Sequence, residues 1–279
     1  MIVATLAVFS GACSVAPTGD IADTDSGSTH ALISVKRSAS VNAAEETRAE
    51  AFAGFLQAPP DVEPGTVLRL AGLGLELPAI GQCQKAAPKA EAGTAVGRVE
   101  LLEVGEVTLA AGGSVTTLAP RAFPSVTDSI SGVVYTTRDR AAGPLPAASA
   151  YTVATTGSAS LGPISVDVAA PGPLEGFELG GLPLAEVGAV DAGTAIELAW
   201  IAGTASDVVY VTFETPVSAS TCAFRDADGH GTVPVSVLPG PSNATVSVHR
   251  LRTLPFADLG LTRGELRFDF ALTAELAFE

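Results

Sequence analysis

Basic and aromatic residues are both scarce in this sequence. Lysine and arginine number 15 against 30 aspartates and glutamates, a formal net charge of −15, and aromatic residues make up 5% of the chain. An acidic chain repels nucleic-acid phosphates and anionic membrane surfaces, so we expect no nucleic-acid partner and no membrane contact based on charge alone. One tryptophan and three tyrosines are also too few for the stripe of exposed rings that carbohydrate-binding sandwiches present.

Motifs of the common enzyme classes are missing as well. The three histidines, His30, His230 and His249, are not placed at metal-ligand spacing. The chain has no G-x-S-x-G elbow, no P-loop and no dinucleotide fingerprint. We therefore predict a protein that is not an enzyme. Paired carboxylates distant in sequence, as in glycosidases, keep an envelope hydrolase on a β scaffold as an alternative.

The sequence contains three cysteines, which is a small and odd number. If Cys13 belongs to an export segment, Cys83 and Cys222 remain as a pair, 139 positions apart. In an exported protein such a pair predicts a disulfide, and two separate buried thiols are the alternative. Closing a loop of this length would stabilise the fold by about 4–5 kcal/mol in the chain-entropy model.

The N-terminus has the pattern of an export signal. An apolar run from Ile2 to Phe9 is followed by small residues and a cysteine, although no basic residue precedes Lys36. Ser10-Gly11-Ala12-Cys13 resembles the lipobox of bacterial lipoproteins, with Ser10 where that family usually has leucine. The resemblance implies that Cys13 carries a lipid such as palmitate and becomes the new N-terminus. Secretion without lipid, or a disordered N-terminus on a cytosolic protein, are the alternatives.

The composition after Cys13 is that of a linker. Residues 14–29 are rich in Asp, Ser, Thr and Gly and show no apolar periodicity, which is typical of a flexible tether. We predict a signal segment over 1–12 and a lipidated cysteine with its tether over 13–29. The expected location is the cell envelope, periplasmic or surface-exposed, with lipid anchoring to the outer membrane.

The remainder of the chain alternates apolar and polar residues between frequent turn residues. The sequence has 29 glycines and 19 prolines, and residues 265–272, ELRFDFAL, are one example of the alternation. This pattern predicts an all-β fold of two β-sandwich-like domains. A turn-rich stretch at 170–181 divides an N-terminal β-rich domain, 30–175, from a second domain, 176–279. Residues 42–56 are expected to form a short helix, with a strand over 48–53 as the alternative.

Residues 193–214, GTAIELAWIAGTASDVVYVTFE, resemble strands B and C of a fibronectin type III domain. The resemblance implies an immunoglobulin-like sandwich in which Trp200 is the core tryptophan and Tyr210 or Val211 the inward contact of the next strand. The whole chain is similar in layout to uncharacterised two-domain β-rich lipoproteins of bacteria. Neither resemblance implies binding residues.

One local motif suggests a metal. In DADGHGTV, residues 226–233, Asp226, Asp228 and Gly231 resemble positions one, three and six of an EF-hand or dockerin calcium loop. His230 and Val237 stand where that loop has oxygen ligands. A tight turn is the main expectation, because Asp and Gly favour turns. A weak calcium site at Asp226 and Asp228, or a transition-metal site using Asp228 and His230, are the alternatives.

Together these observations predict a non-enzymatic, envelope-anchored lipoprotein that acts as a structural or binding module. Its partners would be the membrane, through the lipid, and a protein that the sequence does not identify. A calcium-stabilised adhesion module and the envelope hydrolase are the alternative functions.

Overall fold

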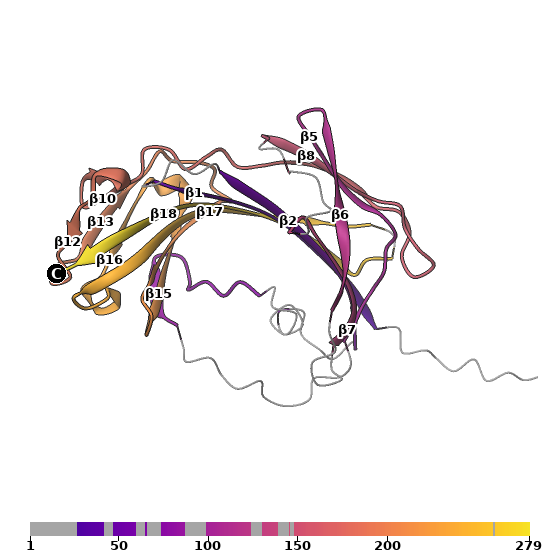
Figure 1. Cartoon of the computed structure of the whole chain (residues 1–279), viewed down its shortest axis with the longest axis horizontal. Coiled ribbons are helices and arrows are strands. Elements are labelled where there is room, and N and C mark those ends of the chain that lie inside the picture. The colour runs from indigo at the N-terminus through magenta and orange to yellow at the C-terminus, as the bar shows by residue number, and fades with distance from the viewer. Residues whose placement is uncertain are drawn as a thin grey trace, which may run out of the picture.

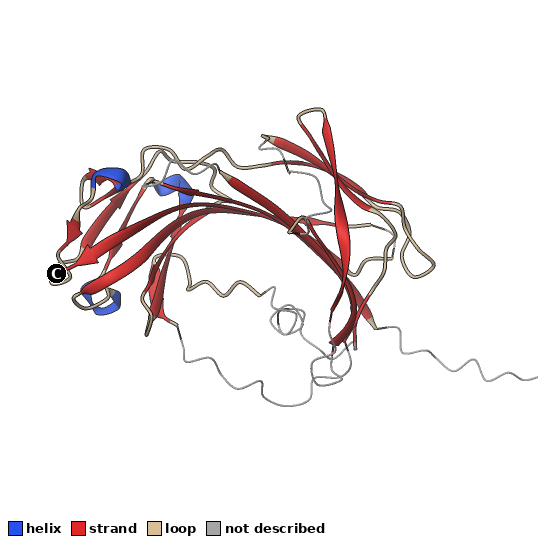
Figure 2. Ribbon diagram, in the orientation of Figure 1, coloured by secondary structure: helices blue, strands red, loops and turns tan. Residues whose placement is uncertain are grey.

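The computed structural model describes residues 27–41, 47–59, 65, 74–86, 99–123, 130–138, 145, 148–258 and 260–279. Strands dominate these residues, and three single-turn 3₁₀ helices accompany them (Figure 2). The strands are β1 (Ser28–Ser40), β2 (Arg48–Ala58), β3 (Gln82–Lys85), β4 (Val99–Leu101), β5 (Val107–Ala111), β6 (Ser114–Phe123), β7 (Ile130–Thr136), β8 (Ala150–Thr155), β9 (Ser165–Ala169), β10 (Glu178–Leu179), β11 (Leu182–Pro183), β12 (Ala189–Val190), β13 (Ile196–Ala199), β14 (Val208–Glu214), β15 (Ala219–Arg225), β16 (His230–Val233), β17 (Ser242–Phe256) and β18 (Arg263–Phe278). The 3₁₀ helices are η1 (Leu184–Glu186), η2 (Asp226–Asp228) and η3 (Val235–Val237).

The described residues form two sheets. The larger has 14 strands in the order β3-β15-β14-β17-β18-β1-β2-β4-β7-β6-β5-β8-β9, with β12 beside β18, and the smaller has the order β11-β10-β13-β16. Figure 1 shows the large sheet as an arch, with the small sheet at one end and β5 and β8 at the other. The all-β sandwich class predicted from the alternation is confirmed.

The centre of the large sheet joins the two ends of the described chain. β1 pairs in parallel with β18, from His30 opposite Arg263 to Ser40 opposite Thr273. β18 pairs on its other side with β17 along almost its whole length. Backbone pairing is therefore continuous across the boundary predicted at 175.

The apolar side chains form two main clusters on one face of this sheet. One cluster contains residues from Leu174 onward and the other mainly residues up to Ala170. β18 contributes to both, because alternate residues of a strand point to the same face. Phe268 and its neighbours Leu266 and Phe270 lie in the second cluster, whereas Leu276 lies in the first. The side chains predicted to share a face in ELRFDFAL do so.

The opposite face of the sheet is mostly polar, and a short segment crosses it. Tyr210, Ala223 and Leu251 form a small apolar cluster there, and Leu75 and Leu77 pack against it. Figure 1 shows residues 74–86 passing beneath the arch, and their last part is β3, which pairs with β15 at the edge of the sheet. The segment thus covers part of this face before it adds an edge strand.

The helix expected within residues 42–56 is wrong over the described part of that range, which is strand β2 from Arg48 onward. Its odd-numbered residues from Ala49 to Phe55 pack in the second cluster, and its backbone pairs with β1. Tertiary pairing therefore overrides the helical spacing of Phe52, Phe55 and Leu56.

At the N-terminal end, β1 begins at Ser28, so the last residues of the range 13–29 predicted to be a tether are strand.

The tryptophan prediction is confirmed. Trp200 directly follows β13, is 5% exposed and packs in the first cluster, and its indole nitrogen donates to the Asp226 carbonyl over 3.0 Å. On the next strand, Val211 is the inward contact, whereas Tyr210 points to the opposite face.

Candidate functional site

The predicted disulfide is present. Cys83 of β3 and Cys222 of β15 are directly opposite in the antiparallel pair, their Cα atoms are 4.0 Å apart and their sulfurs are bonded. Ala86 donates its N–H to Ala219 within the same pair of strands, so the alternation places the cysteines at a non-hydrogen-bonded position, where Cα atoms approach most closely. The bond therefore fixes the four-residue edge strand β3 to its neighbour β15.

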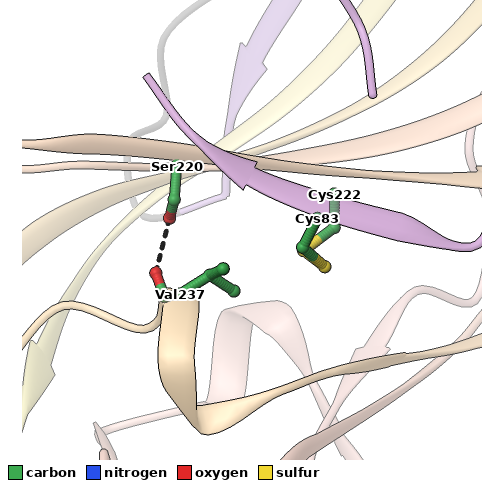
Figure 3. Close-up of a disulfide and its surroundings, with 4 residues drawn as sticks. All are labelled: Cys83, Ser220, Cys222 and Val237. Atoms are coloured by element: carbon green, nitrogen blue, oxygen red, sulfur yellow. Dashed lines mark hydrogen bonds between the residues drawn. A yellow bond between two sulfur atoms is a disulfide. The ribbon is translucent and has the colours of Figure 1, made fainter. Parts of the chain in front are cut away.

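The disulfide lies near η3. Ser220 of β15 donates to the Val237 carbonyl over 2.7 Å, and Figure 3 shows this contact beside the two cysteines. The backbone oxygen of Val237, the residue at the place of a bidentate glutamate in a calcium loop, thus binds a serine hydroxyl.

The DADG motif forms a tight turn. Asp226–Asp228 is η2, and Gly229 ends it with φ +70°, a left-handed conformation that glycine adopts without strain. His230 then begins β16, and its Nδ1 lies 2.8 Å from the Asp228 carbonyl. Cys13, the predicted lipidation site, lies outside the described residues.

Asp226 itself is buried in an ion pair that the sequence did not predict. Its Oδ1 accepts a hydrogen bond from Arg250 Nη2 over 2.9 Å, and the exposed fractions of the two side chains are 0% and 6%. Arg250 also donates to the carbonyls of Pro173 and Ile201, over 2.7 Å each. Oδ2 of Asp226 has no hydrogen-bond partner among the described residues and lies against the bare Cα of Gly203.

A second arginine lies two residues along β17. Arg252 makes a bidentate ion pair with Asp207, with nitrogen–oxygen distances of 2.8 and 2.7 Å. Its Nη1 also donates to the Ala169 carbonyl of β9 over 3.1 Å. Arg250 and Arg252 share the core face of β17 with Val246 and Val248, so their alternation with His249 and Leu251 was the available sequence signal.

A hollow of about 260 Å³ lies beside the two arginines. Its lining includes Arg250, Arg252, Asp207, Glu175 and the loop at 201–204. Because each arginine is bound by a carboxylate, the arrangement fixes the loops that contact β17.

A third cluster lies on the polar face. Asp269 of β18 accepts from the Tyr210 hydroxyl over 3.0 Å and lies 2.7 Å from His249 Nδ1, while the Tyr210 and His249 rings stack with centroids 4.2 Å apart. Burial alone would raise the pKa of Asp269, but the hydrogen bond and charge of His249, with Tyr210 and Lys36, hold it below its ordinary value. Burial, together with Asp269, raises the pKa of Tyr210. His249 is therefore part of a largely buried network on the polar face of the sheet.

A groove lies between β9 and β17. This groove of about 510 Å³ is lined by Val166–Ala169 of β9, by Leu254–Phe256 of β17, and by Leu266. Its lining also includes Arg252, Thr204 and Ser206. The groove is thus lined mainly by apolar side chains, with Asp167 of β9 among its polar residues.

The part of the chain that the structure describes holds no group of three His, Cys, Asp or Glu side chains placed to bind a metal ion. None of the helices in those ranges has the length and hydropathy needed to span a membrane.

Comparison with known proteins identifies no family for this chain. No family model matches the chain, and no curated protein matches it. Among solved structures, the chain is similar to the Fcho1 Mu homology domain of Danio rerio with a bound Eps15 peptide, at 11% identity over 90% of this chain and 98% of that one. The TM-score is 0.28. At that score the similarity assigns neither a fold family nor a ligand to this chain.

Proposed function

We propose that this protein is a non-enzymatic, exported module, anchored to the cell envelope by a lipid on Cys13, that acts by structure or binding. The outer membrane is the proposed site of anchoring. The β-rich domain then projects from the membrane on the linker that precedes β1.

The disulfide is the observation that carries this proposal. Cys83 and Cys222 are bonded in the structure, and disulfides persist in oxidising compartments such as the periplasm and the cell surface. The bond joins an edge strand to a strand from a distant part of the sequence. A fold that uses such a link is suited to export.

The environments of the buried carboxylates support a non-enzymatic role. Asp226 and Asp207 are held by arginines, and Asp269 by His249 and Tyr210. Catalytic carboxylate pairs of glycosidases instead face a common substrate position across several ångströms. Here each acid is neutralised by a neighbouring side chain.

Metabolic labelling tests the anchor. Cells expressing the chain receive radiolabelled palmitate, and we expect label in the wild-type protein and none in Cys13→Ala. Globomycin should cause the unprocessed precursor to accumulate in the wild type only. A wild-type chain that never takes up label would refute anchoring through Cys13.

A further inference from the structure

The edge strand β9 leaves one side of its backbone open. It is the last strand of the large sheet and pairs only with β8 among the described residues. Thr155 donates to the Ile164 carbonyl and Ala170 to that of Ser149, so the even-numbered residues of this stretch make the bonds to β8. Alternation then directs the N–H and C=O groups of Ser165, Asp167 and Ala169 outward.

Part of this edge is already occupied. The Ala169 carbonyl accepts from Arg252, which confirms that odd-numbered residues point outward and closes that end. Among the described residues, the outward N–H and C=O groups of Ser165 and Asp167 have no hydrogen-bond partner. An edge of this kind is where an extended chain can add a strand.

The groove lies directly beside this edge. Val166 and Val168 face the second apolar cluster, and Leu254 and Phe256 of β17 stand half-buried across the gap. A strand added to β9 would place alternate side chains over these apolar groups. The groove therefore favours an extended partner with an apolar residue at every second position.

Charge selects among such partners. Asp167 is on the solvent side of β9, and Arg252 is already neutralised by Asp207. A second copy paired about Asp167 would bring two aspartates together, and each copy has a net charge of −15. Like charges directly opposite destabilise a strand pair, whereas a basic residue opposite Asp167 would stabilise it.

We propose that β9 binds, by antiparallel strand addition, an extended segment of a partner protein in which apolar residues alternate with basic ones. This proposal specifies the partner in the binding role. It rests on the proposed function, because the export of the chain determines the compartment in which the partner is met. Antiparallel pairing is the more stable arrangement per residue. The apolar residues face the groove, and the basic residues lie opposite Ser165 and Asp167.

A synthetic peptide tests the backbone contacts. Fluorescein-labelled (Val-Lys)₃ is titrated with the disulfide-bonded protein, and binding is followed by fluorescence anisotropy. In the proposed register the lysine N–H groups point to β9 and the valine N–H groups point away. We expect N-methylation of the lysines to weaken binding at least tenfold and N-methylation of the valines to change it less than twofold. The opposite pattern, or no binding of the parent peptide, would overturn the proposal.

Charge-reversed variants test the location. Asp167→Lys should weaken (Val-Lys)₃ binding at least tenfold and strengthen binding of (Val-Glu)₃. Glu186→Lys makes the same charge change at an exposed residue of η1 and should have less than a twofold effect. Equal effects of the two variants would refute binding at β9.

Two controls keep the result interpretable. Asp167 also accepts from Thr152 over 2.6 Å, so Asp167→Asn, which removes the charge and keeps an acceptor, replaces the lysine variant if that variant unfolds. Sedimentation analysis shows whether the protein instead dimerises through β9, in which case Asp167→Asn would strengthen self-association and the partner-strand proposal fails.

Peptide binding by a chain that takes up no palmitate would refute the lipid anchor alone. A lipidated chain that binds no peptide would refute strand addition at β9 alone.

Discussion

Arg250 Nη2 lies 2.9 Å from Asp226 Oδ1 in a pair that is almost completely closed off from solvent. The arginine crosses from β17 to the turn after β15 and to the loops at 173 and 201, so one side chain joins several connections that are distant in sequence. Removing one member leaves the other charge buried without its partner.

We therefore expect Arg250→Met to lower the free energy of unfolding by about 3–5 kcal/mol. The double variant Arg250→Met with Asp226→Leu should recover part of that loss, because neither buried charge remains. Urea denaturation measures both variants. A single variant as stable as the wild type would contradict this account of the pair.

Gly203 tests the packing around the same carboxylate. A Cβ at this position would lie 2.0 Å from Asp226 Oδ2, and the carboxylate is held in place by Arg250. Overpacking of this kind costs about 1–3 kcal/mol, so Gly203→Ala should lower the thermal midpoint. Gly240→Ala is the matched control, since a Cβ there meets no atom within 4 Å. Equal midpoints for the two variants would show that the carboxylate can move aside.

Removal of the disulfide should destabilise the protein. The double variant Cys83→Ala with Cys222→Ala loses a link across 139 residues and the fixed edge strand β3, and we expect a loss of about 2–5 kcal/mol. Chemical denaturation of the variant, of the oxidised wild type and of the reduced wild type measures the loss. The variant and the reduced protein should agree, and both should differ from the oxidised form.

The Asp269 network predicts a dependence of stability on pH. Because the folded-state pKa of Asp269 is below the ordinary value of 3.8, the folded state holds the proton less tightly than the unfolded state. Its contribution is therefore complete above the unfolded value and is lost as the pH falls through the folded value. For Asp269→Asn, the free energy of unfolding should depend less steeply on pH below about pH 5. The control Glu275→Gln, at an exposed position of β18, should keep the wild-type slope. Identical curves for Asp269→Asn and the wild type would exclude this network as the source.

The calcium prediction at Asp226 and Asp228 can be tested directly. Since Oδ1 of Asp226 is already held by Arg250, we expect EDTA to leave the thermal midpoint unchanged. A midpoint that falls in EDTA and returns with added Ca²⁺, but not with Mg²⁺, would instead support a calcium-stabilised module.

Residue types and spacing alone predicted a large part of the architecture. Alternation in ELRFDFAL identified the buried face of β18, and the similarity of residues 193–214 to fibronectin type III strands identified Trp200 as core. The disulfide followed from counting cysteines. These features depend on local sequence patterns or on simple arithmetic, so they needed no knowledge of which strands are neighbours.

The tertiary structure decided which strands are neighbours and which side chains form contacts between them. Residues 48–58 form a strand because β1 and the apolar cluster are beside them, although Phe52, Phe55 and Leu56 have helical spacing. The arginine–carboxylate pairs join β17 to loops 24 and 45 residues away in sequence, and the open edge of β9 exists only because no other described strand pairs with it. Side-chain periodicity specifies which face of a strand is buried. The choice of neighbours depends on contacts between distant segments, and no local pattern encodes those contacts.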